Sequence, residues 1–430
     1  MTQQANDIPK WIEDELFEEV FRQTQPKYQS TRNFRISHAL APGENYTTII
    51  LKVEAEVLLK DGLTDDLSYM LKIGHSNENL PKDMKKFDAF DVENGMYKEI
   101  VPEFERMYAK VGRKIRFAAK SYTLATQEEH VLLEDLRRYG FKNVRRQDCL
   151  DLEHLKNALE KLAQWHAASA VMVQQSGLFD MKYRRGMLNE DGKELLQNVF
   201  DDTGRYVLKN ITKLEGHEEY YDEVVKSNYL LEKIYQLFIL LVFQRTFFSK
   251  FTDIFFENAQ VDPEEFNVLN HGDYWSNNIM FQYAPDGSIK STLPVDFQGP
   301  RYGSPAQDLL YLIFSSARLD IKISKFDYFI RFYHQKLIEN LIVLNYSQPL
   351  PTLRELHQML IKYGLWAMVP IAVTLPIILC QPSDKASLDN LIGHTDNSEE
   401  FKNLLYSNTL YLNHLKLTLP WLLYRGALSY

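Results

Sequence analysis

Two aspartates and a carboxamide in the second half of the chain have the residue types and spacing of a site that moves a phosphoryl group. The stretch Val268–Phe281 reads VLNHGDYWSNNIMF, and the segment VDFQ follows at Val295–Gln298. Phosphoryl transfer to an alcohol needs a carboxylate that orients the hydroxyl and accepts its proton, and oxygen ligands that hold Mg²⁺ on the phosphates. Asp273 fits the first role, and Asn278 and Asp296 fit the second.

Short strands are expected to present these polar groups on loops. The apolar pair Val268 and Leu269 leads into the polar turn His271-Gly272-Asp273, and a second apolar run begins at Ile279. This order predicts a strand, a loop and a strand. The pattern H-G-D-x-x-x-x-N has only four fixed residues, so it needs companions elsewhere in the chain.

A run of strict alternation predicts an antiparallel sheet in the N-terminal part. Between Ile49 and Leu59, apolar residues alternate with Lys52, Glu54 and Glu56, as in a strand with one buried face. An Asp-Gly pair then predicts the turn to a partner strand. The five expected strands are Phe34–Leu40, Ile49–Leu59, Leu67–Ile73, Lys114–Tyr122 and Val131–Leu136.

Lys72 is the only lysine inside the apolar strand LSYMLKI, and a lysine on a buried sheet needs charged partners. The next segment, Phe87–Phe104, has helical spacing that puts Glu93 inside the apolar stripe. An ion pair between the two resembles the lysine and glutamate pair that orients ATP in kinases. Glu99 and Glu103 are rival partners on the same helix, and two unrelated surface charges are the other interpretation.

The loop Ala41–Thr48 joins the first two expected strands, where a kinase covers the nucleotide phosphates with backbone N–H groups. It contains one glycine, Gly43, and no G-x-G-x-x-G motif. An ordinary hairpin connection is the alternative interpretation. The position of the loop in the chain favours the phosphate-binding role.

Composition and charge indicate which partners to expect. The chain has 430 residues and 45% hydrophobic content, which predicts two lobes or domains with a large core. A net charge of -9 and a pI near 5.7 give no general attraction to nucleic acid or anionic membranes, so small molecules are the expected partners. Two distant cysteines, Cys149 and Cys380, and an N-terminus without a secretory signal pattern favour the cytosol.

One apolar run, Tyr363–Cys380, approaches the minimum length of a membrane span. Pro370 and Pro376 interrupt the run. We therefore expect a buried helix pair in a helical lobe and no membrane span.

Helical periodicity dominates beyond Asp151, a candidate N-cap for a helix over Leu152–Gln175. His166 lies in the apolar stripe of this helix and is expected to be a hydrogen-bonded core residue. The charged, glycine-containing segment Phe179–Gly216 favours a surface excursion. The other expected helices are Pro9–Phe21, about Glu219–Lys250, part of Asp262–Asn267, Phe326–Asn345 and Leu353–Cys380.

Taken together and in this order, the motifs make the chain similar to the ecdysteroid kinase-like family, which is related to choline kinases and aminoglycoside phosphotransferases. Similar phrases occur at Pro42–Tyr46, Ala163–Ser169, Gly299–Ala306, Asp308–Tyr311 and Gly426, and the resemblance spans about Ile36 to Leu428. It implies a two-lobed α+β fold like that of protein kinases, with a five-stranded antiparallel sheet and a helix in the N-lobe and a large, mostly α-helical C-lobe. The expected divisions are an N-terminal helical extension (1–30), the ATP-binding N-lobe (31–136) and the C-lobe (137–430).

The resemblance also implies roles for single residues near the reacting groups. Asp273 would be the catalytic base, with His271 bracing its loop. Asn278 and Asp296 would bind Mg²⁺. Asp308 would hold the loop by accepting hydrogen bonds from the backbone N–H groups of the loop.

For ATP, the resemblance implies that Lys72, paired with Glu93, binds the phosphates. Gly43, Glu44 and Asn45 would form the phosphate loop. The LLEDL segment would connect the lobes and bind the adenine edge through the backbone from Glu134 to Leu136, although an ordinary edge strand is the alternative. Phe297-Gln298 follows Asp296, where protein kinases have Phe-Gly after the corresponding aspartate.

The implied activity is phosphorylation, with ATP and Mg²⁺, of a hydroxyl on a small and apolar molecule, such as an ecdysteroid or a foreign compound undergoing detoxification. We expect a cytoplasmic monomer. A catalytically inactive, pseudokinase-like protein that binds a small apolar ligand is the alternative function. Hydrolysis by a metal-bound carboxylate pair is disfavoured because the histidine ligands of such sites are missing from the pattern.

Overall fold

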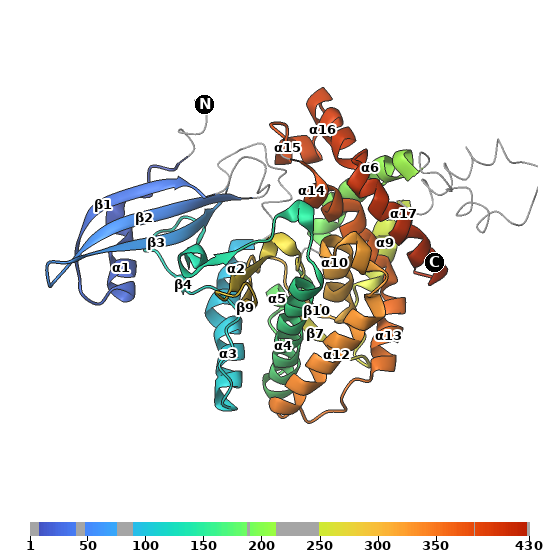
Figure 1. The fold of residues 1–430 in the computed structure, drawn as a ribbon, viewed down its shortest axis with the longest axis horizontal. Coiled ribbons are helices and arrows are strands. Elements are labelled where there is room, and N and C mark those ends of the chain that lie inside the picture. The colour runs from blue at the N-terminus through green and yellow to red at the C-terminus, as the bar shows by residue number, and fades with distance from the viewer. Residues whose placement is uncertain are drawn as a thin grey trace, which may run out of the picture.

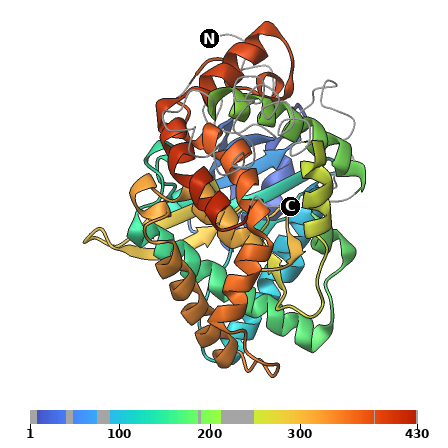
Figure 2. The ribbon, with the colours of Figure 1, turned by 90° about the vertical axis from the view of Figure 1, so that its right-hand side faces the viewer.

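The strands of the N-terminal sheet gather at one end of the molecule, and most of the helices lie at the other (Figure 1). The computed structural model describes residues 8–39, 48–74, 89–186, 190–211, 249–381 and 383–427. Viewed from the helical end, the C-terminal helices lie in front of the N-terminal strands (Figure 2). This is the two-lobed, kinase-like α+β architecture that the sequence predicts.

The N-terminal sheet has five antiparallel strands, as predicted. The structure shows their order, β1-β2-β3-β5-β4. The strands are β1 (Tyr28–His38), β2 (Ile49–Leu59), β3 (Thr64–Ile73), β4 (Ser121–Tyr122) and β5 (His130–Glu134). β4 is much shorter than the expected strand Lys114–Tyr122. Before β4, side chains take the place of a partner strand in binding the backbone. Phe117 N–H donates to the Glu105 carboxylate, and Arg116 O accepts from the Lys161 amine.

One face of this sheet is covered by the N-terminal helices η2 (Asp14–Phe17) and α1 (Glu18–Thr24). Phe17, Val20 and Phe21 are fully buried against the alternating apolar residues of β2 and β3. Because side chains alternate along a strand, Lys72 points to the opposite face from Leu71. Lys72 is therefore directed away from this apolar layer.

A continuous helical segment follows β3 and includes one widened turn. It consists of α2 (Ala89–Gly95), the π-helix η4 (Met96–Ile100) and α3 (Val101–Lys110). The sequence predicted this helix over Phe87–Phe104, and within the described residues it extends further, to Lys110. Glu93 is buried on its inner side.

The C-terminal part is organised around α4 (Leu152–Ser176), which begins as predicted after Asp151. The Asp151 carboxylate accepts from the N–H groups of Glu153 and His154. The other α-helices that the structure describes in this part are α5 (Met181–Arg185), α6 (Glu190–Ile211), α9 (Ser249–Asn258), α10 (Ala306–Ser316), α11 (Leu319–Lys322), α12 (Phe326–Val343), α13 (Leu353–Lys362), α14 (Leu375–Leu379), α15 (Leu388–Ile392), α16 (Asp396–Tyr406) and α17 (Thr409–Tyr424). The short strands are β6 (Phe141–Lys142), β7 (Val268–Asn270), β8 (Ile279–Tyr283), β9 (Ile289–Pro294) and β10 (Arg301–Gly303).

Two expectations for this part were wrong. The expected surface excursion at Phe179–Gly216 contains helices α5 and α6, because Phe200, Tyr206 and Val207 form a buried stripe that the surrounding charges conceal in the sequence. Asp262–Asn267 is a turn, where the Asn267 amide donates to backbone carbonyls. Most of the expected helix Glu219–Lys250 lies outside the described residues.

The segment after α13 is buried, as the sequence predicted, but it is irregular. It passes through a 3-10 helix η9 (Gly364–Ala367) and a π-helix η10 (Pro370–Thr374) into α14. In the described part of the chain no single helix is long and apolar enough to cross a membrane; one bent pair, Leu353–Lys362 with Gly364–Leu379, passes that test by length and composition only.

Candidate active site

The polar loop of the HGD motif lies between β7 and the 3-10 helix η8 (Ser276–Asn278), as the strand, loop, strand pattern predicts. Helix α4 holds β7 from behind. Trp165 Nε1–H donates to Leu269 O at 2.7 Å, and Leu269 N–H donates to Ser169 Oγ at 2.9 Å. The loop is thus fixed to α4, the longest helix among the described residues of the C-terminal part.

Asp308 on α10 binds the start of the loop. Its two carboxylate oxygens accept from the backbone N–H groups of His271 and Gly272 at 2.7 and 3.0 Å. His166 on α4 lies 3.3 Å from the same carboxylate and 2.6 Å from the Tyr333 hydroxyl, so it is the hydrogen-bonded core residue that the sequence predicted. It also orients Asp308, which the sequence did not reveal.

His271 connects the loop to the VDFQ segment. Its Nε2 lies 3.1 Å from Val295 O, and its Nδ1 lies 3.4 Å from the N–H of Asp273. This network is consistent with a neutral ring that donates through Nε2 and accepts at Nδ1. Burial lowers the pKa of His271, which keeps the ring uncharged. Its contacts suit a brace for the loop.

Asp273 is held at both carboxylate oxygens. Its Oδ2 accepts from Asn278 Nδ2 at 2.9 Å, and its Oδ1 accepts from the Tyr311 hydroxyl at 2.8 Å. Burial and the negative charge of Asp296 raise the pKa of Asp273 to about 6, although the hydrogen bonds from Tyr311 and Asn278 oppose this rise. A carboxylate with such a pKa is a stronger base than an exposed one and is still ionised at pH 7.

Lys72 crosses from the sheet to the C-terminal part. Its Nζ lies 2.7 Å from Glu93 Oε2 and 2.6 Å from Asp296 Oδ1. Although burial opposes its charge, Asp296 and Glu93 raise the pKa of Lys72, so the amine is a cation. The rival glutamates have other partners, because Glu99 accepts from Tyr183 at 3.0 Å and Glu103 pairs with Arg106.

Asp296 has a backbone conformation that non-glycine residues seldom adopt, with φ at +68°. The next residue, Phe297, anchors it: this ring is fully buried, stacks on Trp165 with centroids 5.1 Å apart, and meets Tyr97 edge-on. Strained residues of this kind persist where the surrounding packing fixes them, often at functional sites. Val295 N–H donates to Asn278 O at 2.9 Å, which holds the VDFQ segment beside the HGD loop.

Glu134 and Leu136, the connector residues predicted to bind adenine, differ in their hydrogen bonds. The Glu134 carboxylate accepts from Arg116 and from Lys120 N–H, so its side chain has a structural role. Leu136 begins the 3-10 helix η5 (Leu136–Tyr139), and an N–H at that position has no partner within the helix. Gly43, Glu44 and Asn45 lie outside the described residues.

The donor set around Asp273 fits Mg²⁺ bound together with phosphates. Within the described ranges, no group of three or more His, Cys, Asp or Glu side chains could hold a metal ion. Mg²⁺ does not require such a cage, because it commonly takes one or two protein oxygens, substrate phosphates and water. Asn278 uses its amide nitrogen for Asp273, so its carbonyl oxygen is the atom that would bind Mg²⁺.

Sequence reasoning missed Tyr311 and Thr374 as site residues. Tyr311 lies three positions after Asp308 on α10, so both side chains point toward the loop; this spacing was a usable signal. Thr374 is 2.9 Å from the Tyr311 hydroxyl and lies in a segment whose sequence resembles ordinary core.

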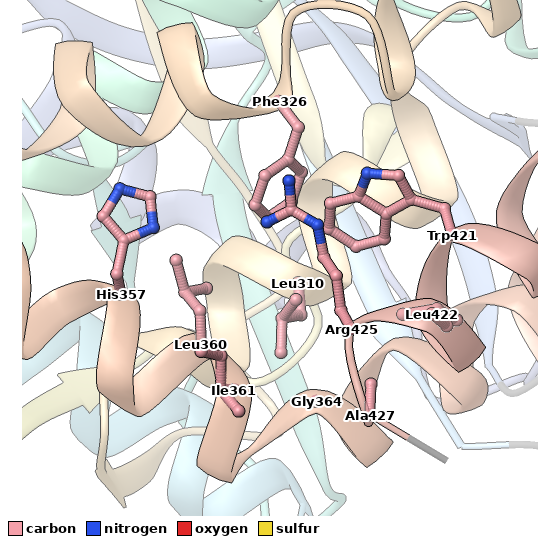
Figure 3. Close-up of a pocket in the computed structure, with 10 residues that line it drawn as sticks. All are labelled: Leu310, Phe326, His357, Leu360, Ile361, Gly364, Trp421, Leu422, Arg425 and Ala427. Atoms are coloured by element: carbon pink, nitrogen blue, oxygen red, sulfur yellow. The ribbon is translucent and has the colours of Figure 1, made fainter.

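A separate small cavity of about 40 Å³ lies among α10, α12, α13 and α17 (Figure 3). Its lining includes Phe326, His357, Trp421 and Arg425, and none of the predicted site residues. It has room for only a few water molecules.

Comparison with known proteins agrees with the resemblance seen in the sequence. No curated protein matches the chain. The model of the ecdysteroid kinase-like family matches residues 42–346, which is more than half of the chain and includes every residue of the HGD and VDFQ segments. With a kinase-like fold and a family match of this extent, the chain belongs to the ecdysteroid kinase-like family.

Proposed function

We propose that the protein is an ATP- and Mg²⁺-dependent phosphotransferase that acts on a hydroxyl group of a small, apolar molecule. The observation that carries the proposal is the convergence of four groups from separate segments. Lys72 from the sheet pairs with both Glu93 from α2 and Asp296, and Asp296 raises the pKa of Asp273 from the neighbouring loop. Family membership supports a kinase-like transfer reaction.

In this proposal, Asp273 accepts the proton of the acceptor hydroxyl as the hydroxyl oxygen forms a bond to the γ-phosphorus. The bond from that phosphorus to the β,γ-bridging oxygen breaks, and ADP leaves. Lys72 orients the phosphates, and Glu93 keeps Lys72 in place. Asn278 and Asp296 would hold Mg²⁺, which would supply positive charge to the phosphate oxygens.

A steroid alcohol such as an ecdysteroid, or a foreign apolar alcohol, is the acceptor class that we infer from the family. A detoxifying role and a cytoplasmic, monomeric protein stay predictions.

The test uses purified protein, labelled ATP, Mg²⁺ and a panel of steroids, phenolic foreign compounds and choline. Wild type should phosphorylate at least one alcohol, and Asp273→Asn should lose about 10²- to 10⁴-fold in kcat, the usual effect of a missing general base. Asp296→Ala should also abolish Mg²⁺-dependent transfer. Asp286→Asn, in the exposed hairpin turn, is the matched control and should keep full activity.

Full activity in Asp273→Asn or Asp296→Ala would refute the proposed mechanism. The alternative function is a pseudokinase-like protein that binds a small apolar ligand without transfer. It would be favoured if no alcohol is phosphorylated and saturating ATP with Mg²⁺ gives no rise in the melting temperature.

A further inference from the structure

The hydroxyl of Tyr311 contacts two groups at once. It lies 2.8 Å from Asp273 Oδ1 and 2.9 Å from Thr374 Oγ1. All three side chains are largely shielded from solvent, and Thr374 is only 5% exposed. Water therefore competes poorly for these bonds.

The direction of the two hydrogen bonds follows from the chemistry of the groups. An ionised Asp273 can only accept, so Tyr311 must donate its single proton to it. Burial raises the pKa of Tyr311 well above its ordinary value, which keeps the hydroxyl protonated. The Tyr311 oxygen then accepts the proton of Thr374. We call these residues the relay: Thr374 donates to Tyr311, and Tyr311 donates to Asp273, so both hydrogen bonds run in the same direction.

Helix α10 supplies the first half of this arrangement. Asp308 binds the backbone of the HGD loop, and Tyr311, one turn later on the same face, binds the side chain of Asp273. One rigid helix therefore fixes both the loop and its aspartate. The other oxygen of Asp273 accepts from Asn278. Hydrogen bonds to both oxygens therefore fix the orientation of the carboxylate plane.

The π-helix η10 supplies the second half. Leu375 N–H donates to Pro370 O across the widened turn, and Thr374 is the last residue of that turn. Pro376 has no N–H for the carbonyl of Ala372, and the Tyr406 hydroxyl donates to this carbonyl at 2.9 Å instead. The Tyr406 hydroxyl thus replaces the hydrogen bond that Pro376 cannot donate. Widened turns of this kind often occur at functional sites.

We propose that Tyr311 and Thr374 are positioning residues that aim Asp273 at the acceptor hydroxyl. The family match ends at residue 346, so Thr374 brings a segment beyond that match into the phosphoryl-transfer site. This inference rests on the proposed function. Its physical basis is that small displacements of a catalytic group, of about 1 Å, cost on the order of 10²-fold in rate.

The first test compares Tyr311→Phe, Thr374→Val and Thr374→Ser with wild type in the phosphorylation assay. Tyr311→Phe should lower kcat about 10- to 100-fold, the usual effect of losing a hydrogen bond to a charged group, with the KM for ATP changed less than twofold. Thr374→Val should lower kcat by a smaller factor. Thr374→Ser keeps the hydroxyl and should restore most of the wild-type kcat.

Tyr108→Phe is the matched control, because it removes another buried hydroxyl, bound to Asn340 and Gln164, that lies outside the relay. It should leave kcat unchanged. In a double-mutant cycle, Tyr311→Phe with Thr374→Val should lose no more activity than Tyr311→Phe alone, because the threonine acts through the tyrosine.

The outcomes separate this inference from the proposed function. If wild type transfers phosphate and Asp273→Asn does not, while Tyr311→Phe and Thr374→Val keep wild-type kcat, the relay is refuted and the function stands. Additive losses, or equal losses in Thr374→Ser and Thr374→Val, would also refute it. If wild type transfers phosphate to no alcohol, the proposed function itself fails.

Discussion

At Gly272, the geometry of the HGD loop permits only glycine. Its φ is +82°, and a Cβ atom there would lie 1.7 Å from the carbonyl oxygen of Gly299. The positive φ favours glycine, and the short distance from the Cβ to the carbonyl oxygen excludes every other residue. The close approach brings the segment after VDFQ against the loop, so the glycine helps to hold Asp296 near Asp273.

Gly272→Ala and Gly287→Ala should separate these two effects. Gly287 has nearly the same φ, +85°, but open space where the Cβ would be. Gly287→Ala should cost about 1–2 kcal/mol of unfolding free energy through backbone strain alone. Gly272→Ala should cost at least about 3 kcal/mol, because overpacking adds to the strain, and should also lower activity.

Urea denaturation and the phosphorylation assay measure both effects. Equal losses of stability in the two variants would show that the contact with Gly299 is unimportant.

At the scale of elements, helix α10 joins the site to a buried lysine. Asp308 and Tyr311 lie in its first half, and the amine of Lys322 donates to the carbonyl of Phe314 near its end. A cation at a helix C-terminus interacts favourably with the helix dipole. Lys322 is fully buried, and burial lowers its pKa to about 7.

This lowered pKa predicts how stability depends on pH. Between about pH 7 and pH 10, the unfolded chain keeps the proton of Lys322 and the folded protein has lost it, so this group makes stability rise with pH. Relative to Lys322→Met, the wild type should gain on the order of 2 kcal/mol between pH 7 and pH 9. Urea denaturation at both pH values measures the difference.

Lys325→Met, at an exposed position on the same segment, is the control and should show no such change relative to wild type. Parallel pH profiles for wild type and Lys322→Met would contradict the assigned ionisation.

The elements that the sequence predicted well are those with a strong local signal. Alternation along β2 and β3 predicted the sheet. Lys72 inside an apolar strand predicted the ion pair with Glu93, because a buried amine needs a carboxylate. Thr374 had no such signal. Its contact with Tyr311 joins residues 63 positions apart, and it depends on an irregular turn between two prolines that local periodicity does not predict.

At the scale of the whole molecule, Lys72 links the two parts at the candidate site. Its ion pair with Asp296 spans 224 positions and joins the N-terminal sheet to the VDFQ segment. Glu93, Lys72 and Asp296 therefore bring one charged group from each of three segments to the same point. A nucleotide with Mg²⁺ that binds here should stabilise both parts together.

Thermal unfolding with ATP and Mg²⁺ tests this expectation. A ligand at 100 times its Kd stabilises the folded protein by about 2.7 kcal/mol, which should raise the melting temperature by a few degrees. Lys72→Met should lose most of this shift with or without the metal, because it removes the cation that we propose binds the phosphates. Asn278→Ala should keep the smaller shift that ATP gives with EDTA and lose the part that Mg²⁺ adds.

The neighbouring Asn277→Ala is the matched control and should keep the whole shift, because Asn277 contributes its backbone carbonyl, rather than its side chain, to the contact with Asn143. If Asn278→Ala and Asn277→Ala respond alike, Asn278 is not a metal ligand. If Lys72→Met keeps the full wild-type shift, the nucleotide does not bind at the junction of the two parts, and the charged cluster there has only a structural role.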